Sequence, residues 1–277
     1  MAGGLLAAGA VCAQAPAERH EALLQPYSLD HSAVIDMAGP NEDSYAIMVA
    51  WPDGDPPPAG WPVLYVLDGE DNFATVALTS RRLARAGARS GIAPGLVVGI
   101  GAGPLERRVR DYTPAVPGYH IPTGKPAAGL LTGGADRFLD FVAHDVMRMI
   151  HRRWRVDEKQ ETIAGHSFGG LLAIHALLTR PALFDRAVAV SPSFWFGEEF
   201  LAREAATMHA LPPLSLLLLT GEQEQGAAAA AKSFIKALPV SAGNHIDQID
   251  LPGQSHGTTM LAALPQIINQ AFAREKP

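Results

Sequence analysis

The chain has 277 residues, enough for one large α/β domain or two small ones. Hydrophobic residues make up 48% and charged residues 18%, which is typical of a globular protein with a sizeable buried core. The 22 basic and 28 acidic residues give a net charge of -6, which disfavours a nucleic-acid binder because such proteins usually carry a basic face. No apolar run approaches the ~20 residues that a membrane-spanning helix needs.

The first fifteen residues differ from the rest of the chain. Residues 4–11 are small and apolar, Cys12 follows, and Ala13-Gln14-Ala15 fits a signal-peptide cleavage site, although a positive segment is missing. We interpret residues 1–15 as the remnant of a signal peptide and residues 16–277 as one domain. This predicts a periplasmic or secreted protein, and without a signal the protein would be cytoplasmic. Cleavage after Ala15 would remove the only cysteine.

The predicted elements alternate between strands and helices. Residues 27–35 and 44–51 are rich in β-forming residues and flank the turn signal Gly39-Pro40-Asn41, which predicts an antiparallel pair at one edge of a sheet. Apolar runs predict buried strands at 63–67, 96–100, 187–190, 214–219 and 246–251. Periodic or alanine-rich stretches predict helices at 71–86, 136–150, 198–208, 227–238 and 258–273.

This alternation predicts a mainly parallel, doubly wound α/β sheet with an antiparallel edge and helices on both faces. Asp136 is the expected N-cap of the helix that it begins. Residues 101–135 are rich in Gly and Pro and are expected to form a long irregular segment. Segments of that length are usually functional or disordered.

The turn Gly165-His166-Ser167-Phe168-Gly169 joins a predicted strand to a predicted helix and has the Gly-x-Ser-x-Gly pattern of a nucleophile elbow. The glycines fit where strand and helix pass too closely for a Cβ atom. The amide of Phe168, at the start of the helix, can point at a developing oxyanion. The pattern predicts Ser167 as a nucleophile, and the alternative is an ordinary glycine-rich turn.

A serine hydroxyl needs a base, usually an imidazole. With such an elbow, the acid and then the histidine follow the serine, each on a loop after a later strand. Among the ten histidines, His256 lies just past the last predicted strand, so it is the candidate base. His166 adjoins the serine, and its side chain is expected to point elsewhere. The alternative is that His256 is a surface-loop histidine.

The acid should follow the strand at 214–219. We favour Glu224, with Glu222 as the second candidate, and a Ser-His pair without an acid stays open. The second oxyanion donor should be an amide just after Leu67, where Gly69 allows close approach, and Glu70 is the candidate.

An ordered set of short motifs covers the chain from about Tyr27 to its end. These motifs are Val-Leu-Tyr-Val-Leu-Asp-Gly (63–69), Arg-Val-Arg-Asp-Tyr-Thr-Pro (108–114), Gly-His-Ser-Phe-Gly-Gly (165–170), Ser-Pro-Ser-Phe-Trp (191–195), Gly-Glu-Gln-Glu (221–224) and Pro-Gly-Gln-Ser-His-Gly (252–257). The set resembles the "Putative esterase" branch of the α/β-hydrolases, and within it the enterobactin-type siderophore esterases. The resemblance implies an α/β-hydrolase fold with Ser167 as nucleophile, His256 as base and Glu224 at the acid position. Some siderophore esterases are thought to work with a Ser-His pair.

The resemblance also implies a use for the long irregular segment. Arg107, Arg108 and Arg110 carry guanidinium groups, which bind planar, anionic, oxygen-rich ligands such as a ferric catecholate. The alternative is that they are solvated or pair with Asp111 structurally. Trp195, at the carboxyl end of a strand, could be a wall of the substrate site or part of the core.

The sequence therefore predicts a carboxylic ester hydrolase that forms an acyl-enzyme on a small-molecule ester, with a ferric siderophore lactone as the candidate substrate. No HExxH or similar ligand cluster implies a metal, and no Walker-type loop implies a nucleotide, so no cofactor is expected. Two alternatives stay open: an acyltransferase with the same three residues, and a non-catalytic binding protein that has kept the fold.

Overall fold

The computed structural model describes residues 28–208, 213–239 and 243–274. Residues 31–277 form one compact unit, and residues 1–30 are assigned to another. Of residues 1–30 the structure describes only 28–30, and these three lie outside any helix or strand. The predicted signal-peptide remnant, residues 1–15, lies outside the described residues. In the described ranges, no helix is both long and apolar enough to cross a bilayer.

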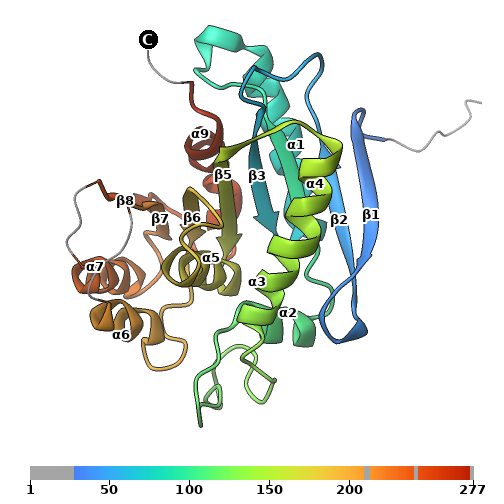
Figure 1. Ribbon diagram of the computed structural model, residues 1–277. Helices are drawn as coiled ribbons and strands as arrows, with labels where there is room; N and C mark the ends of the chain where they lie inside the picture. Colours follow the sequence, from blue (N-terminus) through green and yellow to red (C-terminus); the bar gives the residue numbers. More distant parts are fainter. Residues whose placement is uncertain (1–27, 209–212, 240–242, 275–277) are drawn as a thin grey trace, which may run out of the picture. The chain divides into compact units, whose positions relative to one another are not determined.

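The compact unit is built on one mixed sheet of eight strands, in the order β1-β2-β4-β3-β5-β6-β7-β8 (Figure 1). The strands are β1 (Ser32–Ala38), β2 (Ser44–Ala50), β3 (Trp61–Leu67), β4 (Leu96–Ile100), β5 (Val156–His166), β6 (Arg186–Val190), β7 (Ser215–Gly221) and β8 (His245–Leu251). β1 pairs antiparallel with β2, and β2 with β4, while every other pair is parallel. The predicted parallel sheet with an antiparallel edge is confirmed, although the first strand begins at Ser32 rather than near residue 27.

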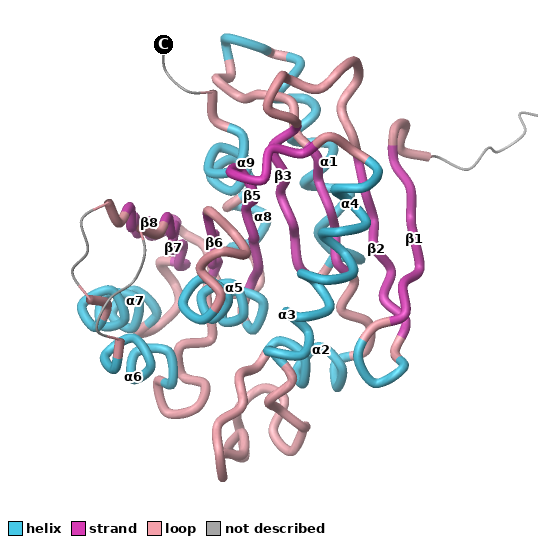
Figure 2. Tube along the Cα trace, viewed as in Figure 1, coloured by secondary structure: helices cyan, strands magenta, loops and turns pink. Residues whose placement is uncertain are grey.

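Helices cover both faces of the sheet (Figure 2). They are α1 (Gly69–Arg85), α2 (Leu105–Tyr112), α3 (Ala135–Phe141), α4 (Arg148–Arg153), α5 (Phe168–Thr179), α6 (Phe200–Thr207), α7 (Ala227–Ala237), α8 (Thr259–Ala262) and α9 (Leu264–Phe272). α1 and α9 lie on one face, and α3 to α7 lie on the other. Every residue of β3 and β4 is buried, because helices pack on both sides of these strands.

The expectation of an irregular segment over residues 101–135 is wrong in part, because it contains α2. Residues 105–112 combine good helix formers with two inward-facing apolar positions, Val109 and Tyr112, both fully buried. The flanking Gly and Pro residues dominated the composition of the segment and concealed this short helix. Pro104, just before the helix, is its N-cap.

Two helix boundaries also differ from the expectation. Gly134, not Asp136, is the N-cap of α3, and Asp136 lies in its first turn, where a carboxylate favours the helix dipole. A π-helical stretch, Val142–Met147, joins α3 to α4. The predicted final helix is divided at Ala263, between α8 and α9, where Pro265 follows in the first turn of α9.

An aromatic cluster holds α2 against α3 and β2. The ring of Phe138 on α3 lies 5.5 Å from Tyr112 on α2 and 5.7 Å from Tyr45 on β2, between ring centroids. Phe141 packs on Tyr45 at 4.9 Å. All four rings are buried, so α2, α3 and β2 are held as one block.

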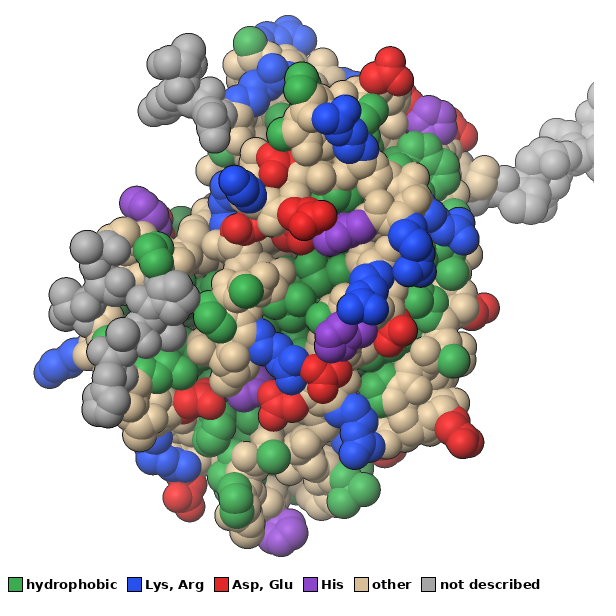
Figure 3. All heavy atoms as spheres, in the orientation of Figure 1, with side chains coloured by type: hydrophobic (Ala, Val, Ile, Leu, Met, Phe, Trp, Pro, Cys, Tyr) green, Lys and Arg blue, Asp and Glu red, His purple; other side chains and the backbone are tan. Residues whose placement is uncertain are grey.

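The parallel strands β3, β5, β6 and β7 end at the same edge of the sheet, which faces the loops drawn in green at the bottom of Figure 1. The turns after Leu67, His166, Val190 and Gly221 are therefore neighbours in space. Side chains of both charges are interspersed on the face that carries α3 to α7 (Figure 3). Because ligands of open α/β sheets bind at the carboxyl ends of the strands, this edge is where a site is expected.

Candidate active site

Ser167 lies on the sharp turn between β5 and α5. Its backbone angles are φ 59° and ψ −115°, a conformation that residues with a side chain rarely adopt. Its amide donates a hydrogen bond to the carbonyl of Val190 at 3.0 Å. A Cβ atom on Gly165 would lie 2.4 Å from the carbonyl oxygen of Gly169, so only glycine fits there. The geometry is that of a nucleophile elbow.

The structure brings Ser167, His256 and Glu224 together from three different loops. His256 Nε2 lies 3.1 Å from Ser167 Oγ. Its Nδ1 lies 2.6 Å from Glu224 Oε1. If Nδ1 carries the proton and donates it to the carboxylate, the lone pair of Nε2 faces the serine hydroxyl. This is the arrangement in which an imidazole can take the hydroxyl proton.

Glu224 is held from its other oxygen. Oε2 accepts hydrogen bonds from the amide of Gly221 at 2.6 Å and from the hydroxyl of Ser191 at 2.5 Å. Burial would raise the pKa of the Glu224 carboxyl, but the hydrogen bonds that it accepts lower its pKa below the usual value. The carboxylate is therefore ionised at neutral pH and can stabilise an imidazolium on His256.

Glu222, the second sequence candidate, lies apart from this chain of hydrogen bonds. Its side chain is exposed and accepts a hydrogen bond from the amide of Gly253 at 2.7 Å. Of the two carboxylates that the sequence left open, the geometry favours Glu224.

Sequence reasoning missed Ser191, which helps to orient Glu224. Ser191 directly follows β6, is buried, and has a positive φ of 44°. Its amide donates to the carbonyl of Leu219 at 2.6 Å, so the backbone here is tied to β7. The signal was present in the Ser-Pro-Ser-Phe-Trp motif, whose first serine is this residue.

His166 does not point away from the site, as the sequence analysis expected. Its ring packs on the ring of His256, with centroids 4.6 Å apart, and its Nε2 lies 2.9 Å from the backbone carbonyl of His256. Burial, and then the charge of His256, lower the pKa of His166 to about 4. A neutral His166 can donate its Nε2 proton to that carbonyl and so hold the loop that carries the base. The expectation failed because the loop that carries His256 lies directly beside the elbow, and the sequence alone does not show this proximity.

The two candidate oxyanion amides begin helices. Phe168 is the first residue of α5 and Glu70 the second residue of α1, positions where amides have no partner within the helix. The Glu70 side chain turns aside and accepts bonds from the amides of Ala102 at 2.9 Å and Gly103 at 3.2 Å. The amide of Asp68 donates to the hydroxyl of Tyr112 at 3.1 Å, and the amides of Asp71 and Asn72 donate to the carbonyl of Asp68.

Arg107 and Arg110 make intramolecular contacts. Arg107 donates to the carbonyls of Ala102 and Ser44 at 2.9 and 2.8 Å. Arg110 pairs with Asp43 at 2.6 Å and with Asp111 at 2.8 Å. These contacts favour the structural alternative for the two arginines, because α2 directs both toward the start of β2, at Asp43 and Ser44.

Arg108 lies on the other side of α2, against the elbow. Its Nε and Nη2 atoms donate to the two oxygens of Asp68 at 2.6 and 2.8 Å, and Nη2 also reaches the carbonyl of His166 at 3.2 Å. Burial opposes the charge of Arg108, but the bonds to Asp68 outweigh burial and raise its pKa. Burial also disfavours the charge of Asp68 and raises its pKa, although the hydrogen bonds and charge of Arg108 act to lower it. These bonds engage Nε and Nη2 of the guanidinium.

Trp195 lines a pocket of about 500 Å³ between residues 116–125 and 195–203. Its ring packs edge-on against Phe168 at 5.7 Å, which places this pocket beside the elbow. The ammonium group of Lys125 lies 5.4 Å from the centre of the Trp195 ring. The sequence analysis did not identify Lys125, because a single lysine in a loop carries no pattern.

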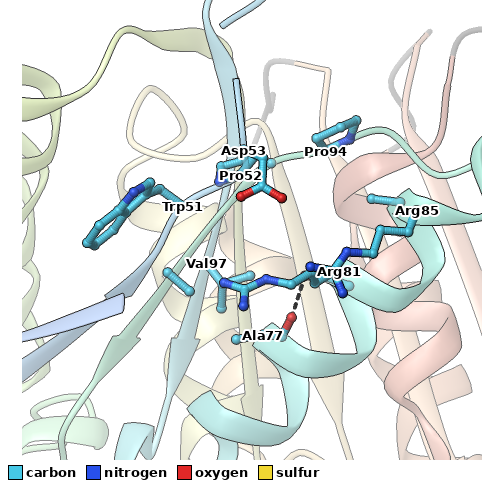
Figure 4. Close-up of a pocket in the computed structure, with 12 residues that line it drawn as sticks. Trp51, Pro52, Asp53, Ala77, Arg81, Arg85, Pro94 and Val97 are labelled. Carbon is cyan, nitrogen blue, oxygen red and sulfur yellow. Dashed lines mark hydrogen bonds between the residues drawn. The ribbon is translucent and has the colours of Figure 1, made fainter. Parts of the chain in front are cut away.

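A second pocket, of about 190 Å³, lies at the amino end of β4 (Figure 4). Trp51, Asp53, Arg81 and Arg85 are among the residues around it. Since β4 and β3 are parallel, this pocket is at the opposite end of the sheet from Ser167. It therefore belongs to no part of the candidate active site. Within the described ranges, no group of three His, Cys, Asp or Glu side chains is arranged to hold a metal ion.

The chain is similar to several known proteins. Residues 41–249 match the family described as "Putative esterase". The chain is 33% identical over 210 residues to ferri-bacillibactin esterase BesA of Bacillus subtilis (strain 168), an alignment that covers 72% of this chain and 73% of BesA. It is 34% identical over 199 residues to a siderophore enterobactin esterase of Emericella nidulans, covering 66% and 64%. The crystal structure of the BES protein from Bacillus cereus has the same fold, with a TM-score of 0.80 at 23% identity, covering 91% and 99%.

Replacing Glu224 by Gln should lower kcat at least ~100-fold. The two donors on Oε2, from Gly221 and Ser191, require an oxygen there, so the amide nitrogen would face His256 Nδ1. That nitrogen donates a proton and would move the imidazole proton to Nε2, the wrong tautomer for a base. Steady-state hydrolysis of p-nitrophenyl butyrate measures the effect. Glu222→Gln is the matched control and should stay within about twofold of the unaltered protein, and equal losses in both variants would contradict the assignment.

The low pKa of His166 predicts a pH-dependent stability. Between pH 6.5, the usual pKa of an unfolded histidine, and about 4, the unfolded chain binds a proton at this position that the folded chain does not. The free energy of unfolding should therefore fall as the pH is lowered through this window. Urea unfolding at several pH values should show a smaller fall in His166→Gln. Parallel curves for the two proteins would rule out the proposed neutral state.

Proposed function

This chain belongs to the "Putative esterase" family of α/β-hydrolases, and from that premise we propose that it cleaves carboxylic esters through an acyl-enzyme on Ser167. One observation carries the proposal. A continuous chain of hydrogen bonds, 3.1 and 2.6 Å long, joins Ser167 Oγ through His256 to Glu224 at the carboxyl edge of the sheet. A serine in a strained turn, a base with a free lone pair and an ionised acid together make an activated nucleophile.

In the first half of the reaction, Ser167 Oγ attacks the ester carbonyl and its proton passes to His256 Nε2. Glu224 stabilises the imidazolium and holds it in position. The carbonyl oxygen becomes an oxyanion and accepts bonds from the amides of Phe168 and Glu70, each worth on the order of 3 kcal/mol in the barrier. His256 then protonates the leaving alcohol as the C–O bond breaks.

In the second half, His256 takes a proton from water, and the hydroxide attacks the acyl carbon on Ser167. A second oxyanion forms in the same place. Collapse of this intermediate returns the proton to Ser167 Oγ and releases the carboxylic acid. His256 is partly exposed, since 53% of its side chain is accessible, so water can reach the base.

We propose a siderophore ester as the substrate class. Two relatives are named as esterases of ferri-bacillibactin and of enterobactin. The pocket beside the elbow supports an aromatic, anionic acyl or alcohol part, because the face of Trp195 offers stacking and Lys125 supplies a positive charge next to it. Lys125 is thus a candidate for recognition of charge.

Ser167→Ala should abolish the reaction. The unaltered protein is expected to release a burst of p-nitrophenol equal to its active sites from p-nitrophenyl butyrate, and the variant should show no burst and a kcat lower by about 10³-fold or more. Stopped-flow absorbance measures both. Unchanged hydrolysis in the variant would exclude the serine mechanism. A panel of ferric and iron-free siderophore lactones beside simple esters then tests the substrate class, and added glycerol reveals any acyl transfer.

Lys125→Gln should raise KM for an anionic aromatic ester several-fold more than KM for a neutral ester of the same size, because only the former gains from the ammonium group. Lys159→Gln is the control, since Lys159 is an exposed lysine on β5, distant along the strand from the elbow. Initial rates across substrate concentrations measure KM. If both esters respond alike to the loss of Lys125, the pocket does not recognise charge.

A further inference from the structure

The segment that follows β6 carries two buried hydroxyl groups beside the reacting residues. Its sequence is Ser191-Pro192-Ser193, and each serine is only 3% exposed. The first hydroxyl donates to Glu224 at 2.5 Å, as described above. The second, Ser193 Oγ, lies 3.3 Å from Ser167 Oγ. One short segment therefore contacts both the acid and the nucleophile.

The main chain holds this segment against the elbow. The amide of Ser193 donates to the carbonyl of Ser167 at 3.2 Å, and the carbonyl of Ser193 accepts the amide of Phe196 at 3.0 Å. A Cβ atom on Gly170, in the first turn of α5, would lie only 3.1 Å from Cα and Cβ of Pro192. Glycine there lets the segment approach the helix closely. The position of the Ser193 hydroxyl is thus set by the backbone around it.

The direction of the bond between the two hydroxyls follows from the neighbouring bonds. Glu224 is ionised and accepts the Nδ1 proton of His256, so Nε2 carries a lone pair and accepts the proton of Ser167. Because that proton points to His256, Ser193 is the donor in its bond with Ser167. Within the described ranges, Ser167 Oγ is also the only hydrogen-bond partner of the Ser193 hydroxyl. A buried hydroxyl normally has such a partner.

A bond donated to the nucleophile is strongest when the nucleophile is charged. As Ser167 Oγ loses its proton to His256, it gains negative charge, and a hydrogen bond to a charged acceptor is about twice as strong as one to a neutral acceptor. A contact that strengthens toward the transition state accelerates the reaction. Resting on the ester hydrolysis proposed above, we propose that Ser193 is a further catalytic residue, whose hydroxyl stabilises the charge that develops on Ser167 Oγ as it attacks the ester carbonyl.

The two halves of the reaction depend on this bond unequally. In acylation, Ser167 Oγ is the nucleophile and carries the developing charge. In deacylation, water is the nucleophile, and Oγ is the oxygen of an uncharged ester, to which a donated bond is weaker. His256 and Glu224 act in both halves. A loss confined to acylation therefore identifies the role of Ser193, whereas a disturbed site would slow both halves.

The test is Ser193→Ala, which removes the hydroxyl and leaves the rest of the segment. Active sites are counted by complete titration with a fluorophosphonate, so that misfolded protein does not enter the rates. Stopped-flow hydrolysis of p-nitrophenyl butyrate gives acylation from the burst phase and deacylation from the steady state. We expect the acylation rate constant to fall about 10-fold and the deacylation rate constant to stay within about twofold.

A second measurement does not depend on a visible burst. The rate constant of inactivation by the fluorophosphonate, in which Ser167 attacks phosphorus, should fall by the same factor as acylation. Should Ser193→Ala not fold, Ser193→Cys keeps a side chain of similar shape with only a weak donor, and the same loss is expected. Ser191→Ala is the matched variant in the same segment. It removes a donor to Glu224, so it should slow acylation and deacylation together.

Equal losses of acylation and deacylation in Ser193→Ala would overturn the inference, because they would make Ser193 a residue that only shapes the site. An acylation rate constant within about twofold of the unaltered protein would also overturn it. A failure of the proposed function is distinguishable from both results, since the unaltered protein would then show no hydrolysis that depends on Ser167.

Discussion

The conformation of Ser167 is the constraint on which the rest of the site depends. A serine with φ 59° persists only where its surroundings fix it, and here β6 binds its amide while Gly165 leaves room for the backbone of Gly169. Its hydroxyl consequently stands clear of the sheet at the carboxyl edge. The neighbouring loops must then bring a base and two amides to one fixed point.

The surrounding loops meet this requirement with buried polar contacts. Ser191 and the amide of Gly221 fix Glu224, and Glu224 orients His256 from one side. His166 holds the backbone of His256 from the other side. Arg108 joins the elbow to the turn at Asp68. Each reacting group is thus supported by a second residue, which is what allows a site built on loops to keep a defined geometry.

The pocket beside the elbow is formed differently, from long loops with few such contacts. Lys125 is exposed, and Trp195 is only partly buried. Loops of this kind tolerate change better than the elbow does, so one framework can serve several esters. A well-supported elbow beside a less constrained pocket fits a family whose members are named as esterases of different siderophores.

The sequence by itself determined the order of strands and helices, the elbow at Ser167 and the position of His256 along the chain, because periodicity and glycine sterics act over a few residues. It did not find α2, whose eight residues lie among Gly and Pro, and so it left open whether Arg107 and Arg110 bind substrate or contact the protein itself. Only the tertiary structure decided between Glu224 and Glu222, turned His166 toward the base and brought Arg108 to Asp68. The physical reason is that these outcomes depend on the directions of side chains on loops that meet in space, and no local pattern in the chain encodes those directions.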